Sequence, residues 1–192
     1  MYITAETHAE TLRVLSEGHT KRLERVEFIQ AGRQFRVGDI EVAPFGIPHD
    51  AVDPLGFTFR AGGVKVAVVT DLGYIPLVVK EHLRDSDGLV LESNHGLEML
   101  KMGPYPWQVK QRVMSRTGHL SNEAVSEFLA DPESFDAHPR FLVLAHLSEQ
   151  NNNPHAAHMS AKEALGRRPS TAAFAGELLI ASQDEPLPPM QL

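Results

Sequence analysis

The sequence predicts one mixed α/β domain over residues 1–183, followed by a proline-rich tail at residues 184–192. Short runs of large apolar residues, typical of buried strands, recur along the chain. Segments with helical spacing separate the later runs, and turn residues bound most of them. A length of 192 residues is sufficient for one domain with a substantial core. The composition of the tail predicts disorder.

The first 70 residues are expected to form mostly strands. Apolar patterning predicts strands at residues 1–4, 25–29, 33–37, 40–44, 57–60 and 64–70. Residues 7–17 are predicted to be a helix, because their leucines have helical spacing and Thr7 with Glu10 resembles a capping box. The glycine-rich turn at residues 61–63 is expected to join the last two strands as a hairpin.

The rest of the chain alternates helices with strands. Helices are predicted at residues 76–84, 96–101, 107–116, 122–130 and 154–166. Ser121 is expected to cap the fourth of these helices. Strands are predicted at residues 89–92 and 141–145, with a last short strand within residues 171–181. In α/β folds, ligands bind just past the carboxyl ends of such strands.

The composition is ordinary for a soluble globular protein, with 42% hydrophobic and 22% charged residues. No stretch approaches the roughly 20 apolar residues of a membrane span, and the N-terminus shows no signal-peptide pattern. The absence of cysteine excludes disulfides and thiolate metal sites. We therefore expect a cytoplasmic protein without a membrane partner. The formal charge of −7 argues against non-specific coating of nucleic acid, but a bound divalent metal can reverse the local charge where a phosphate binds.

Three polar clusters at the ends of predicted strands carry candidate metal ligands. Asp71 and His146 each follow an apolar run directly, and His49 lies in a Pro-His-Asp-Ala turn. Histidine and aspartate delivered from several strands to one rim suit a divalent cation. Simpler interpretations remain open, since Asp71 could cap a helix near Tyr74 and His146 could begin an asparagine-rich turn. Gly73 is expected to let the backbone turn sharply after the strand.

Glu92 and His119 form a second candidate pair. Glu92 ends a predicted buried strand, where an unpaired carboxylate would be costly. A contact with His119 would orient its imidazole and make it a general acid for a leaving oxygen. A structural hydrogen bond that pins a loop explains the same residues equally well. Asp50 or Asp53 could orient the ring of His49 in a similar way.

The segment after His146 is rich in hydrogen-bonding side chains and is predicted to contact substrate. Its candidate contacts are Ser148, Asn151 and Asn152. Basic residues that could bind phosphates are found mainly on the predicted helices. They are Lys101, Lys110, Arg112, Arg116, Arg167 and Arg168.

Five short motifs occur in a fixed order along the chain. They are Pro-His-Asp-Ala at 48–51, Thr-Asp-Leu-Gly at 70–73, Leu-Glu-Ser-Asn-His at 91–95, Gly-His-Leu-Ser-Asn at 118–122 and Ala-His-Leu-Ser at 145–148. Together they resemble the metallo-β-lactamase fold, and more narrowly its YycJ/WalJ-like branch, which is related to the RNase Z and RNase J nucleases. The resemblance covers roughly residues 49–168. It implies an αββα sandwich with metals at one edge.

The resemblance also implies roles for individual residues. His49 would be a ligand of one metal, His146 a ligand of the second, and Asp71 would bridge them. Glu92 and His119 match a catalytic pair near the leaving group. The implied cofactors are two divalent cations, Zn²⁺, Mn²⁺ or Fe²⁺. The implied reaction is metal-assisted, exonuclease-like hydrolysis of a phosphodiester, with nucleic acid as the substrate and with Ser148 in the phosphate-side loop. A small phosphodiester or an ester remains open as the substrate, since a fold does not fix its function.

The chain departs from this family in having no His-x-His-x-Asp-His segment, which supplies most ligands to both metals in the family. Two remaining ligands per ion are fewer than the three of most catalytic zinc sites. We therefore expect an N-terminally truncated C-terminal portion of such a hydrolase, with weak metal binding, little activity alone and an uncovered apolar sheet face or edge. The alternative is a non-catalytic remnant that serves as a binding or assembly domain. Completion of the site by an oligomer partner is a third possibility.

Overall fold

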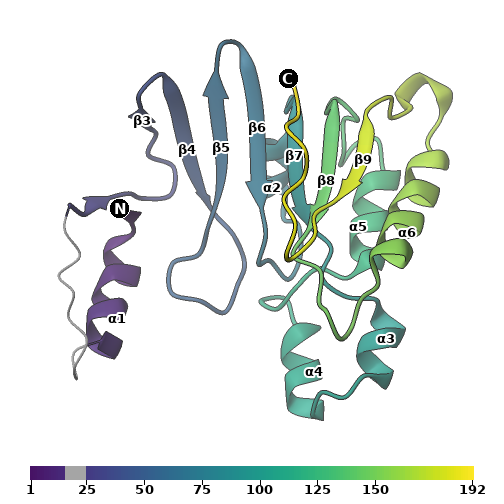
Figure 1. The fold of residues 1–192 in the computed structure, drawn as a ribbon, viewed down its shortest axis with the longest axis horizontal. Helices are drawn as coiled ribbons and strands as arrows, with labels where there is room; N and C mark the ends of the chain where they lie inside the picture. Colours follow the sequence, from purple (N-terminus) through teal and green to yellow (C-terminus); the bar gives the residue numbers. More distant parts are fainter. Residues whose placement is uncertain (16–24) are drawn as a thin grey trace.

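The computed structural model describes residues 1–15 and 25–192 (Figure 1). Its elements are β1 (Tyr2–Ile3), α1 (Ala5–Leu15), β2 (Glu27–Phe28), β3 (Phe35–Val37), β4 (Ile40–Gly46), β5 (Leu55–Ala61), β6 (Val64–Val69), α2 (Leu77–Leu83), β7 (Gly88–Glu92), α3 (Leu97–Met102), α4 (Trp107–Val113), α5 (Asn122–Ala130), β8 (Phe141–Ala145), α6 (Pro154–Gly166), the 3₁₀ turn η1 (Ser170–Ala172) and β9 (Glu177–Ile180). The last two residues of the first predicted helix, 16 and 17, lie outside the described residues.

Seven strands form one sheet in the order β3-β4-β5-β6-β7-β8-β9 (Figure 1). Strands β3 to β6 pair antiparallel, whereas β6 to β9 pair parallel. Parallel neighbours need long crossover connections, and α2, α3 to α5, and α6 lie in the three crossovers. The short strands β1 and β2 form a separate parallel pair. The predicted mixed α/β class is confirmed.

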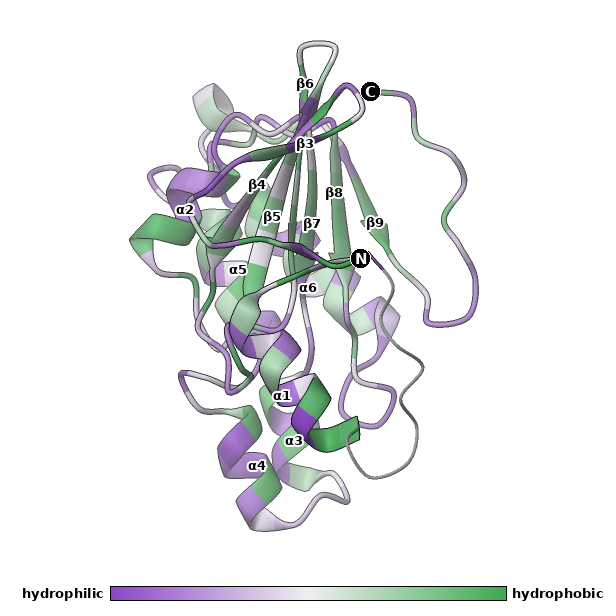
Figure 2. Cartoon of the chain, turned by 90° about the vertical axis from the view of Figure 1, so that its left-hand side faces the viewer, coloured by the Kyte–Doolittle hydropathy of each residue, from purple (hydrophilic) through white to green (hydrophobic). Residues whose placement is uncertain are grey.

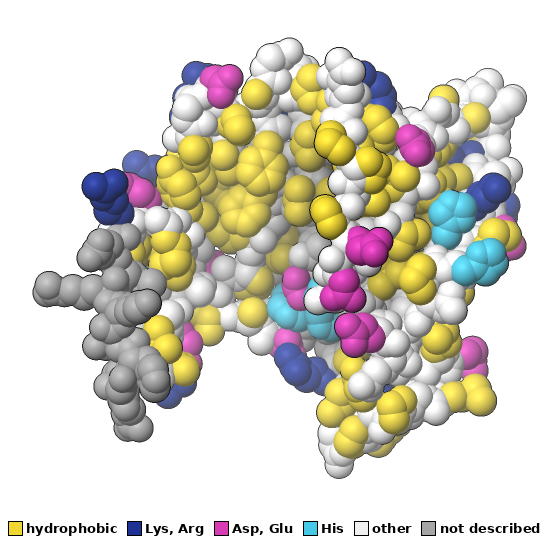
Figure 3. All heavy atoms as spheres, in the orientation of Figure 1, with side chains coloured by type: hydrophobic (Ala, Val, Ile, Leu, Met, Phe, Trp, Pro, Cys, Tyr) yellow, Lys and Arg dark blue, Asp and Glu magenta, His cyan; other side chains and the backbone are white. Residues whose placement is uncertain are grey.

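Side chains alternate between the two faces of this sheet, and the faces have different surroundings. The covered face packs against α2, α5 and α6, and its core residues are Ala67, Val69, Leu89, Leu91, Leu142 and Leu144. The open face carries partly buried apolar residues, namely Phe57, Phe59, Val66, Val68 and Val90. Figure 2 shows α2 and α5 on one side of the sheet and the C-terminal tail on the other. Figure 3 shows hydrophobic side chains gathered over β4 to β6.

Most element ends lie within two residues of the predicted ends, and β9 lies within the predicted range 171–181, after the chain has turned through η1. The end of one helix differs by more. Helix α4 ends at Val113, three residues before the predicted end at 116. The loop that follows passes so close to the helix that a Cβ on Gly118 would lie 2.2 Å from the Val113 carbonyl oxygen. Glycine is therefore needed where the chain turns back toward the sheet.

The tail at residues 184–192 contains no helix or strand and lies along the open face (Figure 2). At its end, Leu192 Cδ1 lies 3.4 Å from where a Cβ on Gly88 would stand. The disorder expected from its composition stays a prediction. Within the described ranges, the implied αββα arrangement is represented by the large sheet with its helical layer and by the small β1–β2 pair with α1. No helix in these ranges is long and apolar enough to cross a membrane.

Candidate metal centre

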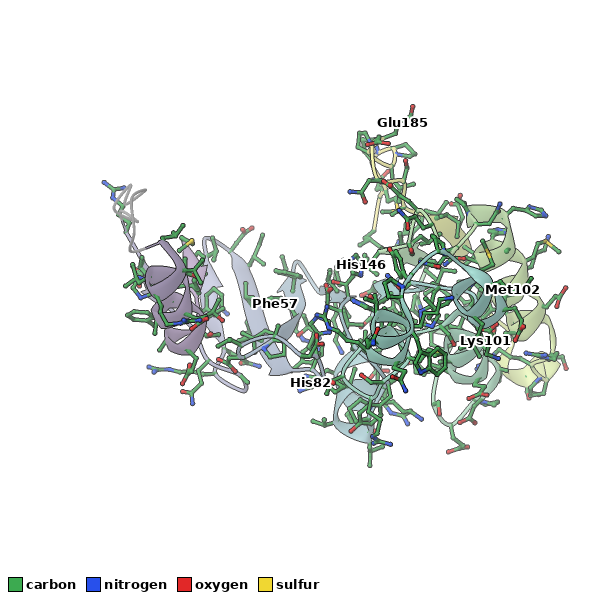
Figure 4. The ribbon with its side chains drawn as sticks, turned by 90° about the horizontal axis from the view of Figure 1, so that it is seen from below. Phe57, His82, Lys101, Met102, His146 and Glu185 are labelled. Atoms are coloured by element: carbon green, nitrogen blue, oxygen red, sulfur yellow. The ribbon has the colours of Figure 1, made fainter. Side chains whose placement is uncertain are left out.

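Four of the predicted site residues meet at one end of the parallel half of the sheet. Asp71 follows β6, Glu92 ends β7 and His146 follows β8, and the pairing register places these strand ends level. His119 joins them from the loop between α4 and α5. One ligand atom of each residue lies within 4.8 Å of those of the other three. Figure 3 shows histidine and acidic side chains below the hydrophobic patch, and Figure 4 labels His146 in the view from below.

The backbone takes an unusual conformation at two of these residues. Asp71 and His146 have φ angles of 60° and 57°, in the left-handed region that non-glycine residues rarely adopt. Such strain persists only where the surroundings enforce it, and it is frequent at functional sites. Glycine is required at position 73 for a different reason from the one predicted. A Cβ there would lie 2.4 Å from the carbonyl carbon of Arg116, so Gly73 permits two loops to pack closely rather than providing a special φ angle.

Glu92 is fully buried and is the centre of the cluster. Its Oε1 accepts hydrogen bonds from Nδ1 of His119 at 2.9 Å and from Nδ1 of His146 at 2.5 Å. Three backbone N–H groups also donate to its carboxylate, those of Asp71, Leu72 and Leu120. A carboxylate has about four lone-pair positions, so five donors leave no room for a cation. Glu92 therefore orients the two imidazoles rather than binding a metal itself.

These contacts shift two pKa values in opposite directions. Burial opposes ionisation of Glu92, but the hydrogen bonds from His119, His146 and the Leu120 N–H outweigh it and lower the pKa of Glu92 to about 2. The hydrogen bond to Glu92 raises the pKa of His146, against the opposing effect of burial. Glu92 is thus an anion throughout the physiological range, and its two neighbouring rings donate through Nδ1. Both Nε2 atoms are left available for a metal or a proton.

His49 lies beside the cluster and is held by a backbone group. Its Nδ1 donates to the Gly118 carbonyl at 3.1 Å, and its Nε2 lies 3.9 Å from Asp71 Oδ1. Its ring centroid is 5.0 Å from that of His119, which in turn lies 5.2 Å from that of His146. A histidine that donates one N–H to a backbone carbonyl presents its other nitrogen as a ligand. The structure therefore brings all five predicted metal and catalytic residues together.

The partner predicted for the His49 ring is different in the structure. The carboxylate of Asp50 binds the Arg112 guanidinium, with Nη2 to Oδ1 at 3.0 Å, and this hydrogen bond lowers the pKa of Asp50. Asp50 remains 3.6 Å from His49 Nε2, but the Gly118 carbonyl orients the ring. Asp53 occupies a left-handed turn position, with a φ angle of 50°. Arg112, with a side chain 65% exposed, brings a positive charge to the rim of the site.

The residues around Asp71 have the donor types that suit a divalent cation. They are the Asp71 carboxylate and the imidazoles of three histidines, each ring being fixed through its Nδ1. The Thr70 hydroxyl donates to Asp71 Oδ2 at 2.9 Å, which leaves Oδ1 facing the rings. Imidazole and carboxylate ligands, each with an orienting hydrogen bond, are typical of zinc, manganese and iron sites.

The predicted substrate loop is used largely inside the protein. Asn152 is 7% exposed and its Nδ2 donates to the Ser93 carbonyl at 2.7 Å, so it supports the loop rather than facing a substrate. Asn151 is 1% exposed, and its backbone N–H and Nδ2 both donate to Ser148 Oγ. Ser148 is partly exposed, and Asn151, although almost fully buried, lines the same cavity beside the site.

Sequence reasoning missed a buried polar network beneath this loop. Ser93 Oγ donates to Asn122 Oδ1 at 2.7 Å, and Asn122 Nδ2 donates to Asn152 Oδ1 at 2.9 Å. Ser93 and Asn122 belong to the motifs at 91–95 and 118–122, but nothing in the sequence distinguishes a buried amide side chain from an exposed one. Two predicted phosphate contacts also have internal partners. Arg168 donates to three backbone carbonyls, and Lys110 Nζ donates to the Lys101 carbonyl at 2.6 Å.

Comparison with known proteins gives a consistent group of relatives. A family profile described as "Beta-lactamase superfamily domain" matches residues 2–147. Exodeoxyribonuclease YycJ of Bacillus anthracis is 41% identical over 128 residues, which cover 67% of this chain and 48% of YycJ. Exodeoxyribonuclease WalJ of Streptococcus pneumoniae serotype 2 is 35% identical over 131 residues, which cover 68% of this chain and 48% of WalJ. The chain thus spans about half the length of the curated relatives it matches.

Solved structures extend the likeness to almost the whole chain. The metallo-beta-lactamase fold protein YhfI from Bacillus subtilis matches 94% of this chain and 61% of its own, with a TM-score of 0.61 and 19% identity. A diphosphatase from the PhnP family matches 94% of this chain and 54% of its own, with a TM-score of 0.55 and 16% identity. Sequence identities of 19% and 16% show only that the fold is shared.

Proposed function

We propose that this chain, which belongs to the beta-lactamase superfamily, is part of a metal-dependent hydrolase that removes nucleotides from DNA ends. The family and fold implied by the sequence motifs are confirmed. Two relatives named exodeoxyribonucleases share 41% and 35% identity with the chain, which favours DNA as the substrate. The observation that carries the proposal is the single Glu92 oxygen that orients both His119 and His146.

The donor set suits two divalent cations that share Asp71. His49 with Asp71 would hold one ion, and Asp71 with His146 the other. Because each ion has only two of these ligands, we expect weak binding by this chain alone. Zn²⁺, Mn²⁺ and Fe²⁺ all accept histidine and aspartate ligands. Bound there, such cations would lower the pKa of water and neutralise charge on the phosphate oxygens.

His119 would act on the leaving group. Glu92 holds its Nδ1–H, so the ring keeps one orientation and its Nε2 can carry a proton. We propose that this Nε2 protonates the oxygen that leaves phosphorus. His119 and His146 thus contact the same carboxylate oxygen but have different tasks.

DNA would approach across the rim that carries Arg112. This side chain is 65% exposed and adjoins Asp50, which is itself beside His49. Its guanidinium could contact a phosphate if its two hydrogen bonds to Asp50 are exchanged for hydrogen bonds to the phosphate oxygens. Ser148, at the surface on the other side of His146, is the remaining candidate on the phosphate side. The cytoplasmic location expected from the sequence stays a prediction.

The first experiment is a titration of the chain with Mn²⁺. The electron paramagnetic resonance signal of the free ion measures how much Mn²⁺ is bound at each step. Substitution of a residue that only hydrogen-bonds to a metal ligand typically lowers metal affinity roughly tenfold. We expect Asp71→Asn and His146→Ala, which change ligands themselves, to weaken Mn²⁺ binding by more than this. His119→Ala should retain Mn²⁺ binding and slow the hydrolysis of bis(p-nitrophenyl) phosphate and end-labelled DNA. Asp39→Asn, in an exposed turn, is the matched control.

The pair of histidine variants makes this test specific, because both rings bind the same oxygen of Glu92. Equal loss of Mn²⁺ in the two variants would contradict the separate roles. Unchanged Mn²⁺ binding by Asp71→Asn would contradict the metal site itself. A chain that binds no Mn²⁺ and hydrolyses neither substrate would favour the alternative of a non-catalytic binding or assembly domain.

A further inference from the structure

A cavity of about 360 Å³ opens beside the metal centre. Its walls include Asn94, Tyr105, Val113, His119, His146 and Ser148. Ligand pockets in proteins begin at roughly 300 Å³, so the cavity suits one small ligand rather than a length of duplex. The two histidines on its wall are the same two that Glu92 orients. A ligand in this cavity would therefore border the reacting atoms.

Tyr105 provides the aromatic surface of this cavity, and its position is fixed by its neighbours. It lies half-buried in the turn between α3 and α4, between Pro104 and Pro106, whose rings restrict the backbone. Lys110 Nζ binds the Lys101 carbonyl and ties the two helices together.

The same turn is packed against the loop that follows β8. A Cβ on Gly103 would lie 2.2 Å from Asn151 Oδ1, and the Asn151 carbonyl accepts a hydrogen bond from the Gly96 N–H at 3.0 Å. The turn that carries Tyr105 is therefore held in place by the β8 loop, as the support of a stacking surface must be.

The walls of the cavity carry three kinds of surface. Tyr105 and Val113 offer apolar surface, amide and hydroxyl groups offer hydrogen bonds, and His119 and His146 offer imidazole nitrogens. Glu149 also lines the cavity, and its negative charge would repel a phosphate, which the imidazoles would attract instead. A planar ring joined through a sugar to a phosphate matches these three kinds of surface.

We propose that the cavity holds the terminal nucleotide of a DNA strand, with its base stacked on Tyr105 and its phosphate directed to His119 and His146. This inference rests on the proposed function, which it deepens by assigning a specificity-determining residue. Base stacking on an aromatic side chain tolerates every base, because each base has a π face. A cavity of this size beside the metal centre would confine cleavage to single nucleotides at a strand end.

The test is calorimetric titration of the chain with thymidine 5′-monophosphate, in EDTA and in Mn²⁺. We expect Tyr105→Ala to weaken binding roughly tenfold, the lower range for loss of one stacked base, and Tyr105→Phe to bind as the unchanged chain does. Trp107→Ala is the matched control, because Trp107 is 60% exposed, two residues away and outside the cavity wall. Thermal unfolding verifies that each variant folds.

Deoxyribose 5-phosphate, which lacks a base, tests the same idea without a substitution. It should bind the unchanged chain more weakly than the nucleotide, and Tyr105→Ala should not alter its affinity. The proposal is overturned if Tyr105→Ala binds the nucleotide normally, if sugar phosphate and nucleotide bind equally, or if the unchanged chain binds no nucleotide at millimolar concentrations. The titrations in EDTA report on the cavity alone, whereas failure of the metal centre would appear only in the Mn²⁺ titration of Asp71→Asn.

Discussion

The two faces of the seven-stranded sheet are both apolar, yet the helices enclose one face more completely than the other face is enclosed. On the covered face, Val69 and Leu91 are completely buried beneath the helices. On the open face, the adjacent residues Val68 and Val90 are only partly buried. There the C-terminal tail, rather than a helix, lies beside the sheet (Figure 2). The same strands therefore contribute very unequally to the core, depending on which face a side chain points to.

This difference also explains where the candidate metal centre lies. Glu92 is two residues after Val90 and so points to the open face, yet it is fully buried. The Glu92 carboxylate is enclosed by His119, His146 and the backbone N–H of Leu120, at the end of the strand where apolar neighbours give way to polar ones. The site thus covers one end of the open face. Substitutions on the two faces should therefore change the free energy of unfolding by different amounts.

The largest effect is expected from paired substitutions in β7. Leu91→Ala removes a fully buried side chain from the covered face and should lower the free energy of unfolding by about 3 kcal/mol. Val90→Ala, one residue earlier on the open face, should lower it by about 1 kcal/mol or less. Urea unfolding followed by circular dichroism measures both values. Equal losses would show that the open face is enclosed in solution, for example by a second copy of the chain.

An intermediate effect is expected from pH, through a buried histidine beneath α5. His95 is 1% exposed, and neither ring nitrogen has a hydrogen-bond partner among the described residues. Burial lowers the pKa of His95 to about 4, against the opposing effect of Glu123 and Glu92. In the unfolded chain its pKa is about 6.5. Between these values only the unfolded chain binds the proton, so stability falls as the pH drops from about 6.5 to 4.

At pH 5 this residue alone should cost about 2 kcal/mol of stability relative to pH 7. His95→Leu keeps a similar volume and removes the titrating group, so the difference in unfolding free energy between the two pH values should shrink by about that amount. His155→Leu, on the exposed side of α6, is the control. An unchanged difference in the His95→Leu chain would show that the ring is not buried in its neutral form.

The fold and the members of the site could be predicted for the same reason. Apolar runs identify strands, and residues that follow parallel strands must meet at one edge, so Asp71, Glu92 and His146 were expected to lie together. What could not be predicted depends on distances between loops. The sharing of one Glu92 oxygen by two rings, the contact that requires Gly73 and the position of Tyr105 follow from how separate loops pack. Sequence spacing carries no record of that packing.

The smallest change in stability is expected from the open face itself. Val66→Thr with Val68→Thr preserves side-chain shape and strand propensity, so the double variant should change the free energy of unfolding by less than about 1 kcal/mol. The apolar patch becomes more polar, so binding of the dye ANS should decrease. Val69→Thr is the matched change on the covered face, where a buried hydroxyl without a partner costs about 1–3 kcal/mol. If the double variant is destabilised as much as Val69→Thr, then the open face is also covered in solution. The helix-covered face would then not be the main source of buried apolar surface.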